Sequence, residues 1–463
     1  MALISTPEAY IDAHRERILA ELVEFLRIPS VSTEPAHAGD VTAAAHWVAD
    51  RLRAAGPLAV EVWPTAGHPV VYAEWLGAPG APTLLIYGHY DVQPADPLDA
   101  WRSPPFTPDL REGRLYARGA SDDKGPMLVP IKAAEAFFAV HQRLPINVKL
   151  LFEGEEEIGS AHLEECVALH AARLEADWAL SADGAMWRPD KPSLTLGSRG
   201  IVALDVEVRG PATDLHSGRH GGAVQNPLHA IAALIAGLHH ADGSVAVSGF
   251  YSDVRRPSDA ERHAIAALGF DEESYRTKVG VPALFGEAGY STLERQWLRP
   301  TLEVNGLYGG YQGAGSKTAI PRAAYAKITC RLAPDQRPEE VMRQVTRHLE
   351  THILPGATVR VTPHAGSAPA YRLDPAHRGV RLAGDALRRR YGKEPALVLM
   401  GGTLPISDLL RRILGIDTVY FSFSTADEDF HAPNEFFRLA RLWDGTATWI
   451  DYWRDAGSSR LTA

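Results

Sequence analysis

Five short segments of this 463-residue chain carry histidine and acidic side chains in patterns that suit metal-dependent chemistry. They are 88–91 (GHYD), 121–125 (SDDKG), 153–157 (EGEEE), 181–184 (SADG) and 430–433 (FHAP). Taken singly, each has a structural explanation: an acidic pair before a helix is typical of an N-terminal cap, and a run of glutamates is typical of a solvated surface. The glutamates of 153–157 repel one another, however, and a cation would relieve that repulsion. The joint occurrence of all five segments therefore indicates a metal site.

The segments supply two histidines, two aspartates and a glutamate as ligands, without cysteine. Donors of this kind suit zinc, manganese or cobalt better than a soft metal. Five ligands are too many for one four-coordinate ion that keeps a position open for water. They suit two ions about 3.5–4 Å apart that share a bridging carboxylate. A further glutamate beside the glutamate ligand is then available as a general base.

Strands and helices alternate in the first part of the chain, and they predict how these segments meet. Apolar runs predict strands, and amphipathic or apolar stretches of helical length predict helices. The strands are 83–87, 146–152 and 177–180, and the helices are 8–27, 41–55, 127–141 and 161–174. Four of the five segments follow a predicted strand directly, and the segment with Asp122 precedes a helix. Because ligands bind beyond the carboxyl ends of the strands in open α/β sheets, we expect the five segments to converge.

The pattern changes near residue 198, which predicts a second domain. Strands at 202–208 and 326–332 alternate apolar and polar residues, as expected for a sheet with one wet face. Helices at 226–240 and 338–352 and a strand at 357–362 complete this region, whereas 243–300 gives no clear pattern. From about residue 374 the first pattern returns, with helices 376–391 and 405–413 and strands 396–400 and 417–423. The prediction is an α/β catalytic domain (1–197 and 374–463) with a helix-covered, mostly parallel sheet, interrupted by an inserted α+β domain (198–373).

In this order the motifs resemble the M20 metallopeptidase family, and most closely its dipeptidase and carnosinase-like branch. The resemblance runs from LRIPSV at 26–31 to the segment around His431. It implies that one metal ion is held by His89, Asp122 and Asp183. It implies that the other is held by Asp122, Glu157 and His431, so that Asp122 bridges the two ions.

The same resemblance assigns roles to the residues beside these ligands. Glu156 would be the general base, and Asp91 would orient the ring of His89. The resemblance also implies a cis peptide bond between Asp122 and Asp123.

The inserted domain resembles the family's lid and dimerisation domain. The DLHSG motif at 214–218 implies that His216 reaches the active site of the partner subunit and binds the oxyanion. Substrate contacts are implied for Thr318 in KTAIP (317–321), for Arg331 in CRL (330–332) and for Gly402 and Thr403 in GGT (401–403). Arg331 lies on the polar face of its predicted strand, which suits bidentate carboxylate binding. Thr403 stands where this branch has serine, which keeps the hydroxyl and adds a methyl group.

These residues together predict a two-metal hydrolase that cleaves the amide bond of dipeptides or similar short peptides. A metal-bound water would attack, and Glu156 would activate it. The cofactors are two divalent ions per chain, expected to be zinc, with manganese or cobalt as alternatives. An N-acyl amino acid deacylase or desuccinylase of the same family is the alternative activity. A binding protein that has lost its metals is a further alternative, and the intact ligand set opposes it.

Composition restricts the partners of this chain. The formal net charge is −10, which argues against nucleic acid and anionic membranes as partners. No stretch approaches 18 uncharged apolar residues, and the first residues lack the pattern of a secretory signal, so we expect no membrane span and no export. The two cysteines, Cys166 and Cys330, fit a reducing compartment. We therefore expect a cytoplasmic enzyme that binds a small peptide and forms a homodimer through the inserted domain.

Overall fold

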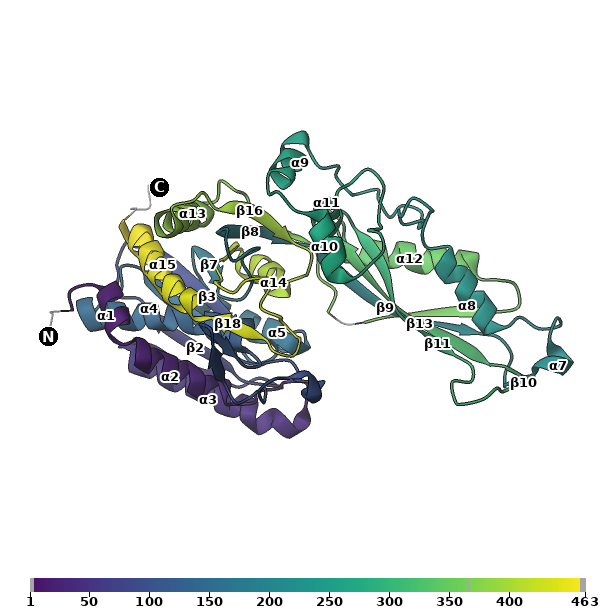
Figure 1. Ribbon diagram of the computed structural model, residues 1–463, viewed down its shortest axis with the longest axis horizontal. Helices are drawn as coiled ribbons and strands as arrows, with labels where there is room; N and C mark the ends of the chain where they lie inside the picture. The colour runs from purple at the N-terminus through teal and green to yellow at the C-terminus, as the bar shows by residue number, and fades with distance from the viewer. Residues whose placement is uncertain (1–3, 365, 459–463) are drawn as a thin grey trace. The chain divides into compact units, whose positions relative to one another are not determined.

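The chain divides into two compact units in the computed structural model, which describes residues 4–364 and 366–458 (Figure 1). Unit 1 comprises Met1–Leu196, Leu373–Val398 and Leu409–Ala463. Unit 2 comprises Gly197–Arg372 and Leu399–Asp408. The short stretch 399–408, which the sequence pattern grouped with 374–463, therefore belongs to unit 2.

Unit 1 is built on a six-stranded sheet with the order β1-β2-β6-β3-β7-β17. Its strands are β1 (Ala59–Trp63), β2 (Val70–Trp75), β3 (Thr83–His89), β6 (Asn147–Glu153), β7 (Trp178–Ser181) and β17 (Thr418–Tyr420). The pairs β6–β3, β3–β7 and β7–β17 are parallel, whereas β1–β2 and β2–β6 are antiparallel. The predicted α/β class with a mostly parallel sheet is confirmed. Strands β1 and β2 were not predicted.

Helices cover this sheet, and the most buried of them is α4 (Gly125–His141). Helix α4 is apolar nearly all round because it packs against β3 as well as α1, α3 and α15. The other helices of unit 1 are α1 (Pro7–Ala13), α2 (Arg15–Leu26), α3 (Ala38–Ala55), α5 (Leu163–Leu169), α6 (Ala171–Leu174), α13 (Arg378–Tyr391) and α15 (Leu439–Ser458). The single helix predicted over 8–27 is two helices, because His14 leaves helical geometry at φ −118° and ψ 17°.

A small antiparallel sheet brings two distant segments of unit 1 together. Its order is β18-β5-β4, with β4 (Asp109–Arg111), β5 (Arg114–Tyr116) and β18 (Phe436–Arg438). Phe436 pairs with Tyr116, so the loop that precedes β18 lies beside the turn that follows β5. These two connections carry His431 and Asp122.

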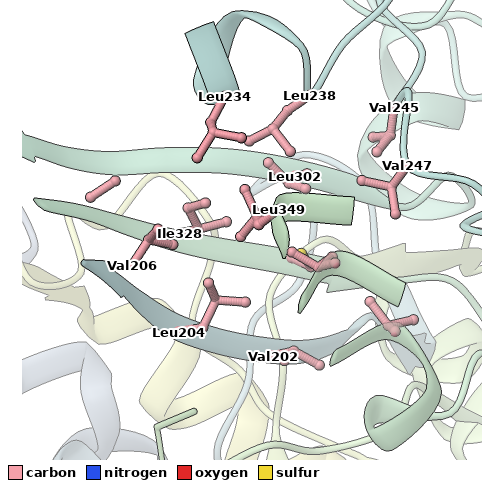
Figure 2. Close-up of a cluster of buried hydrophobic side chains, with 14 of the residues drawn as sticks. Val202, Leu204, Val206, Leu234, Leu238, Val245, Val247, Leu302, Ile328 and Leu349 are labelled. Carbon is pink, nitrogen blue, oxygen red and sulfur yellow. The ribbon is translucent and has the colours of Figure 1, made fainter. Parts of the chain in front are cut away.

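Unit 2 contains a four-stranded antiparallel sheet with the order β11-β13-β9-β14. The strands are β9 (Gly200–Arg209), β11 (Thr301–Gly309), β13 (Ala323–Leu332) and β14 (Thr358–Pro363). Helices α8 (Pro227–Ala236) and α12 (Pro338–His352) pack on one face, where Val206, Ile328 and Leu302 of the sheet meet Leu234 and Leu349 of the helices (Figure 2). The opposite face carries the polar residues of each strand, as the alternating pattern predicted.

The remaining elements of unit 2 are short. A two-stranded sheet joins β10 (Leu215–His216) to β12 (Ala319–Ile320), and α7 (Ser217–His220) follows β10. The stretch 243–300, which gave no clear pattern, contains α9 (Asp259–Ala266), α10 (Glu272–Val279) and α11 (Thr292–Trp297).

Three elements contain points at which the chain passes from one unit to the other: β8 (Ser193–Ser198), β16 (Ala396–Met400) and α14 (Pro405–Leu414). The short strand β15 (Tyr371–Arg372) pairs with β8. Across the described residues, no helix has both the length and the apolar character that a bilayer crossing requires.

Candidate metal centre

The five predicted ligands converge at the carboxyl end of the parallel strands of unit 1. They form two groups, His89–Asp122–Asp183 and Asp122–Glu157–His431, and in each group one donor atom per residue lies within 4.8 Å of the others. Asp122 belongs to both groups, which is the arrangement that a bridging carboxylate requires. The sequence therefore identified residues that the fold brings together from positions more than 300 residues apart.

The connections that carry these ligands follow the predicted pattern with one exception. His89 ends β3, Glu157 lies four residues after β6, and Asp183 lies two residues after β7. Asp122 lies in the turn Ala120–Lys124 before α4, where the peptide bond to Asp123 is cis, as the resemblance implied. His431 does not directly follow a strand: ten residues separate it from β17, and β18 holds its loop in place.

The ring of His89 shows that the site suits a cation. Its Nδ1 lies 3.1 Å from the carbonyl oxygen and 3.4 Å from the carboxylate of Asp91, and its Nε2 lies 3.0 Å from Asp122 Oδ1. A neutral imidazole has only one N–H, yet both ring nitrogens face oxygen acceptors. The ring must therefore carry a second proton or share a cation with Asp122. Burial disfavours the charge, but Asp122 and Asp91 raise the pKa of His89 well above its ordinary value.

The other group of ligands has the same character. The Nε2 atom of His431 lies 3.1 Å from Asp122 Oδ2 and 3.2 Å from Glu157 Oε2, so one nitrogen faces two carboxylates. These carboxylates raise the pKa of His431 to about 10. Burial, together with the carboxylates of Asp122 and Glu157 and against the effect of His89, raises the pKa of Asp183 to about 7. Nitrogen and oxygen donors that crowd together in this way fit divalent ions, which offset the repulsion.

Glu156 lies beside this centre with its carboxylate unengaged. Its side chain makes no hydrogen bond with any residue that the structure describes, whereas its neighbour Glu157 accepts a hydrogen bond of 2.8 Å from Gln93 Nε2. Burial raises the pKa of Glu156 well above its ordinary value; the nearby carboxylates, led by Asp183, add to this effect and His89 opposes it. A free, basic carboxylate next to a metal centre has the placement that a general base needs.

Asp91 connects two of the ligand-bearing segments. Its carboxylate is fully buried and accepts hydrogen bonds from the backbone N–H groups of Glu156 (3.2 Å) and Glu157 (3.1 Å) and from the hydroxyl of Ser32 (2.7 Å). It also faces His89 Nδ1, so it fixes that ring and the 156–157 turn at once.

The sequence analysis missed the residue that joins Asp122 to His431. Glu435 is fully buried, and its carboxylate accepts hydrogen bonds from the N–H groups of Gly119 (2.9 Å), Ser121 (2.9 Å) and Asp122 (3.1 Å). Arg118 Nη1 donates a further bond of 2.7 Å. An acidic residue within the apolar stretch after His431 was the only signal in the sequence, and it did not indicate a partner 313 residues away.

The predicted oxyanion donor lies in unit 2, at an exposed position in the two-stranded sheet of β10 and β12. His216 pairs with Ala319, and the carbonyl of Thr318 accepts a hydrogen bond of 3.0 Å from Ser217 N, so the fold brings His216 and Thr318 together. The Nδ1 atom of His216 accepts a hydrogen bond of 3.0 Å from Gly218 N. The proton of the neutral ring is therefore on Nε2, which leaves that N–H free to donate.

The predicted substrate-binding residues Arg331, Gly402 and Thr403 form another group in unit 2. Arg331 Nη1 donates a hydrogen bond of 2.7 Å to Thr403 Oγ1. The carbonyl of Gly402 accepts a hydrogen bond of 3.1 Å from the backbone N–H of Arg199.

Comparison with known proteins gives consistent matches over almost the whole chain. A family model described as peptidase family M20/M25/M40 matches residues 85–455. The chain is 31% identical to the human Beta-Ala-His dipeptidase over 96% of this chain and 91% of that protein. It is 29% identical to a Cys-Gly metallodipeptidase of Schizosaccharomyces pombe over 97% of both chains. Among solved structures, an M20 family metallo-carboxypeptidase from Sulfolobus solfataricus matches with a TM-score of 0.86 at 32% identity, over 96% of this chain and 99% of that one.

Proposed function

The chain belongs to peptidase family M20/M25/M40, and from this membership we propose a two-metal hydrolase that cleaves dipeptides with free C-terminal carboxylates. The observation that carries the proposal is the pair of ligand groups that share Asp122, with the unengaged carboxylate of Glu156 beside them. The relatives named above are all peptidases, which supports a peptide substrate over an N-acyl amino acid.

The metal ions would be held by His89, Asp122 and Asp183 and by Asp122, Glu157 and His431. We propose zinc, with manganese or cobalt as alternatives, since the described ligand groups contain no sulfur. When bound, such ions lower the pKa of water and polarise a carbonyl oxygen.

The side chains of the protein would then move protons and stabilise charge. Glu156 would accept the proton of the attacking water and return it to the departing amine. The Nε2–H group of His216 of the partner subunit would donate to the oxyanion that forms at the scissile carbonyl. Arg331 would bind the C-terminal carboxylate of the substrate.

We propose that this enzyme is a homodimer that associates through unit 2. The edge strand β11 supports this proposal, because Leu307 and Tyr308 on that strand and Tyr311 just after it are 52%, 44% and 53% exposed. An exposed strand edge with apolar side chains suits pairing with a second copy of the chain.

We also propose a reducing compartment such as the cytoplasm. This proposal is supported by Cys166 and Cys330, which are both buried and unpaired.

The test is a panel of free dipeptides, the same dipeptides amidated at the C-terminus, and N-acetyl amino acids, with amine release as the measurement. We expect turnover of the free dipeptides, loss of activity with a chelator and poor turnover of the amides. The variant Arg331→Ala should raise KM for free dipeptides by roughly 10- to 100-fold, as expected for the loss of a charge-assisted hydrogen bond, and should change the amides little. Equal turnover of acid and amide would mean that the enzyme holds the substrate by its other end, and faster turnover of N-acetyl amino acids would favour a deacylase.

A further inference from the structure

The guanidinium group of Arg331 has an unusual environment on the open face of the unit 2 sheet. It borders a cavity of about 530 Å³ whose lining includes Arg199, Thr329 and Glu303. Arg331 forms no ion pair with any residue in the described ranges, and its one side-chain hydrogen bond is the bond from Nη1 to Thr403 Oγ1. Its other N–H groups are therefore available to a ligand.

The single proton of the Thr403 hydroxyl is engaged within the protein. It accepts the hydrogen bond from Arg331 and donates one of 2.7 Å to the carbonyl oxygen of Arg199. Since a hydroxyl has a single proton, Thr403 has none left to donate to a substrate. The predicted contact of Thr403 with the substrate would therefore not be a hydrogen bond that its hydroxyl donates.

Arg199 fixes the segment from which Thr403 projects. Its backbone N–H lies 3.2 Å from the carbonyl oxygen of Met400 and 3.1 Å from that of Gly402, and its Nε donates a bond of 2.9 Å to the carbonyl of Gly401. Its Nη1 donates a bond of 3.2 Å to the carbonyl of Arg299. One residue thus binds every backbone carbonyl from 400 to 402 and the side chain of 403.

The charge around Arg331 favours the binding of an anion. Burial and the neighbouring Arg331 together lower the pKa of Arg199 to about 10, against the effect of Glu303, and burial also lowers the pKa of Arg331. Neither arginine forms an ion pair with a described residue; Glu303 at the same cavity favours the charge of Arg199, and a bound anion would offset the remaining cost of two neighbouring cations.

We propose that Thr403 is a positioning residue, which Arg199 holds in place and which orients the guanidinium of Arg331 toward the substrate carboxylate. This inference rests on the proposed function, because it takes Arg331 as the carboxylate anchor. The β-branched side chain suits the role, since the added methyl group restricts χ1 and keeps the hydroxyl on the line between Arg331 and the carbonyl of Arg199.

A double-mutant cycle tests this positioning contact, in which Thr403 holds Arg331 (the Thr403–Arg331 relay). Thr403→Val keeps the shape of the side chain and removes the hydroxyl, and it should raise KM for a free dipeptide about tenfold with little change in kcat, as expected for losing a bond to a charged group. Thr403→Ser should restore KM to within about threefold of the wild type. In the Arg331→Ala background, Thr403→Val should change KM by less than about twofold, because residues that act through one another are not additive.

Two controls accompany the cycle. Thr351→Val removes a hydroxyl from helix α12 of unit 2, which does not line the cavity, and that hydroxyl donates a bond of 2.7 Å to the carbonyl of Arg347, so KM should stay within about twofold. Thermal unfolding and metal content of each variant report whether the fold survives.

The outcomes separate the relay from the proposed function. An unchanged KM in Thr403→Val, or the same increase with and without Arg331, would overturn the relay while leaving Arg331 as the anchor. An unchanged KM in Arg331→Ala would overturn the carboxylate anchor and the relay with it.

Discussion

Two adjacent glutamates of the metal centre have different surroundings at the scale of single residues. Glu157 is fixed by Gln93 and faces His431, as a ligand should be. The carboxylate of Glu156 has no hydrogen-bond partner among the described residues and lies close to the carboxylates of Asp183 and Asp122. The backbone produces this division, because Asp91 binds both N–H groups and fixes the direction in which each side chain leaves the turn.

The first prediction separates the roles of these neighbours. Glu156→Gln should lower kcat by at least about 10²-fold and retain normal metal content, since it removes only the general base. Glu157→Gln should lose metal, because an amide supplies no charge to the ion. Metal analysis and steady-state kinetics on both variants provide the test, with Glu165→Gln on the exposed face of α5 as the control. If Glu156→Gln empties a metal site instead, the two roles are exchanged.

At the scale of elements, the metal centre depends on the contact between the turn Ala120–Lys124 and the loop before β18. Glu435 binds three N–H groups of the 119–122 backbone, and the Ser121 hydroxyl donates to Glu428 of the same loop. Burial, against the effect of Arg118, raises the pKa of Glu435 to about 7. This contact sets the distance between Asp122 and His431, which we assign to one ion.

The second prediction concerns this contact. Glu435→Gln puts an amide NH₂ group against N–H donors, so it should weaken metal binding by roughly 10- to 100-fold, the usual effect of losing a partner of a metal ligand. Competition with a chromophoric chelator measures the affinity without using activity. Glu294→Gln, which changes a buried glutamate of unit 2, is the matched control and should leave metal affinity unaltered. Equal affinity in wild type and Glu435→Gln would show that the two loops are held by other contacts.

Sequence periodicity predicted those elements in which the spacing of the apolar residues along the chain determines which face is buried. Helix α12 was predicted over 338–352 and runs from Pro338 to His352, and β16 was predicted over 396–400 and runs from Ala396 to Met400. The motifs likewise indicated the five candidate ligands that the fold brings together, because metal chemistry restricts residue types. Glu435 and Arg199 escaped prediction because their backbone partners are about 100 to 320 residues away. No local pattern encodes such partners.

At the scale of the whole molecule, the proposed catalytic groups belong to different units. The metal centre and Glu156 are in unit 1, whereas His216 is in unit 2 and exposed, in the two-stranded sheet of β10 and β12. We assign His216 to the metal centre of the partner subunit, so each active site would need two chains. Isologous dimers make this arrangement twice by symmetry.

The third prediction tests action across the dimer. Glu156→Gln and His216→Ala should each be nearly inactive as homodimers. When the two are unfolded and refolded together, a mixed dimer has one site with both intact groups and one site with neither. Random pairing makes half of the dimers mixed, so activity should recover to about a quarter of the wild type. If subunits exchange and no activity returns, His216 acts within its own chain.

The number of ions that activity requires tests the central claim most directly. The metal-free protein is titrated with zinc, and bound metal and dipeptide hydrolysis are measured at each step. Activity should reach its maximum at two ions per chain. The variant Asp122→Ala, which removes the shared ligand, should bind neither ion tightly. The variant His89→Ala should weaken the binding of mainly one ion. Full activity with a single tightly bound ion per chain, or two tightly bound ions in Asp122→Ala, would contradict a two-metal centre bridged by Asp122.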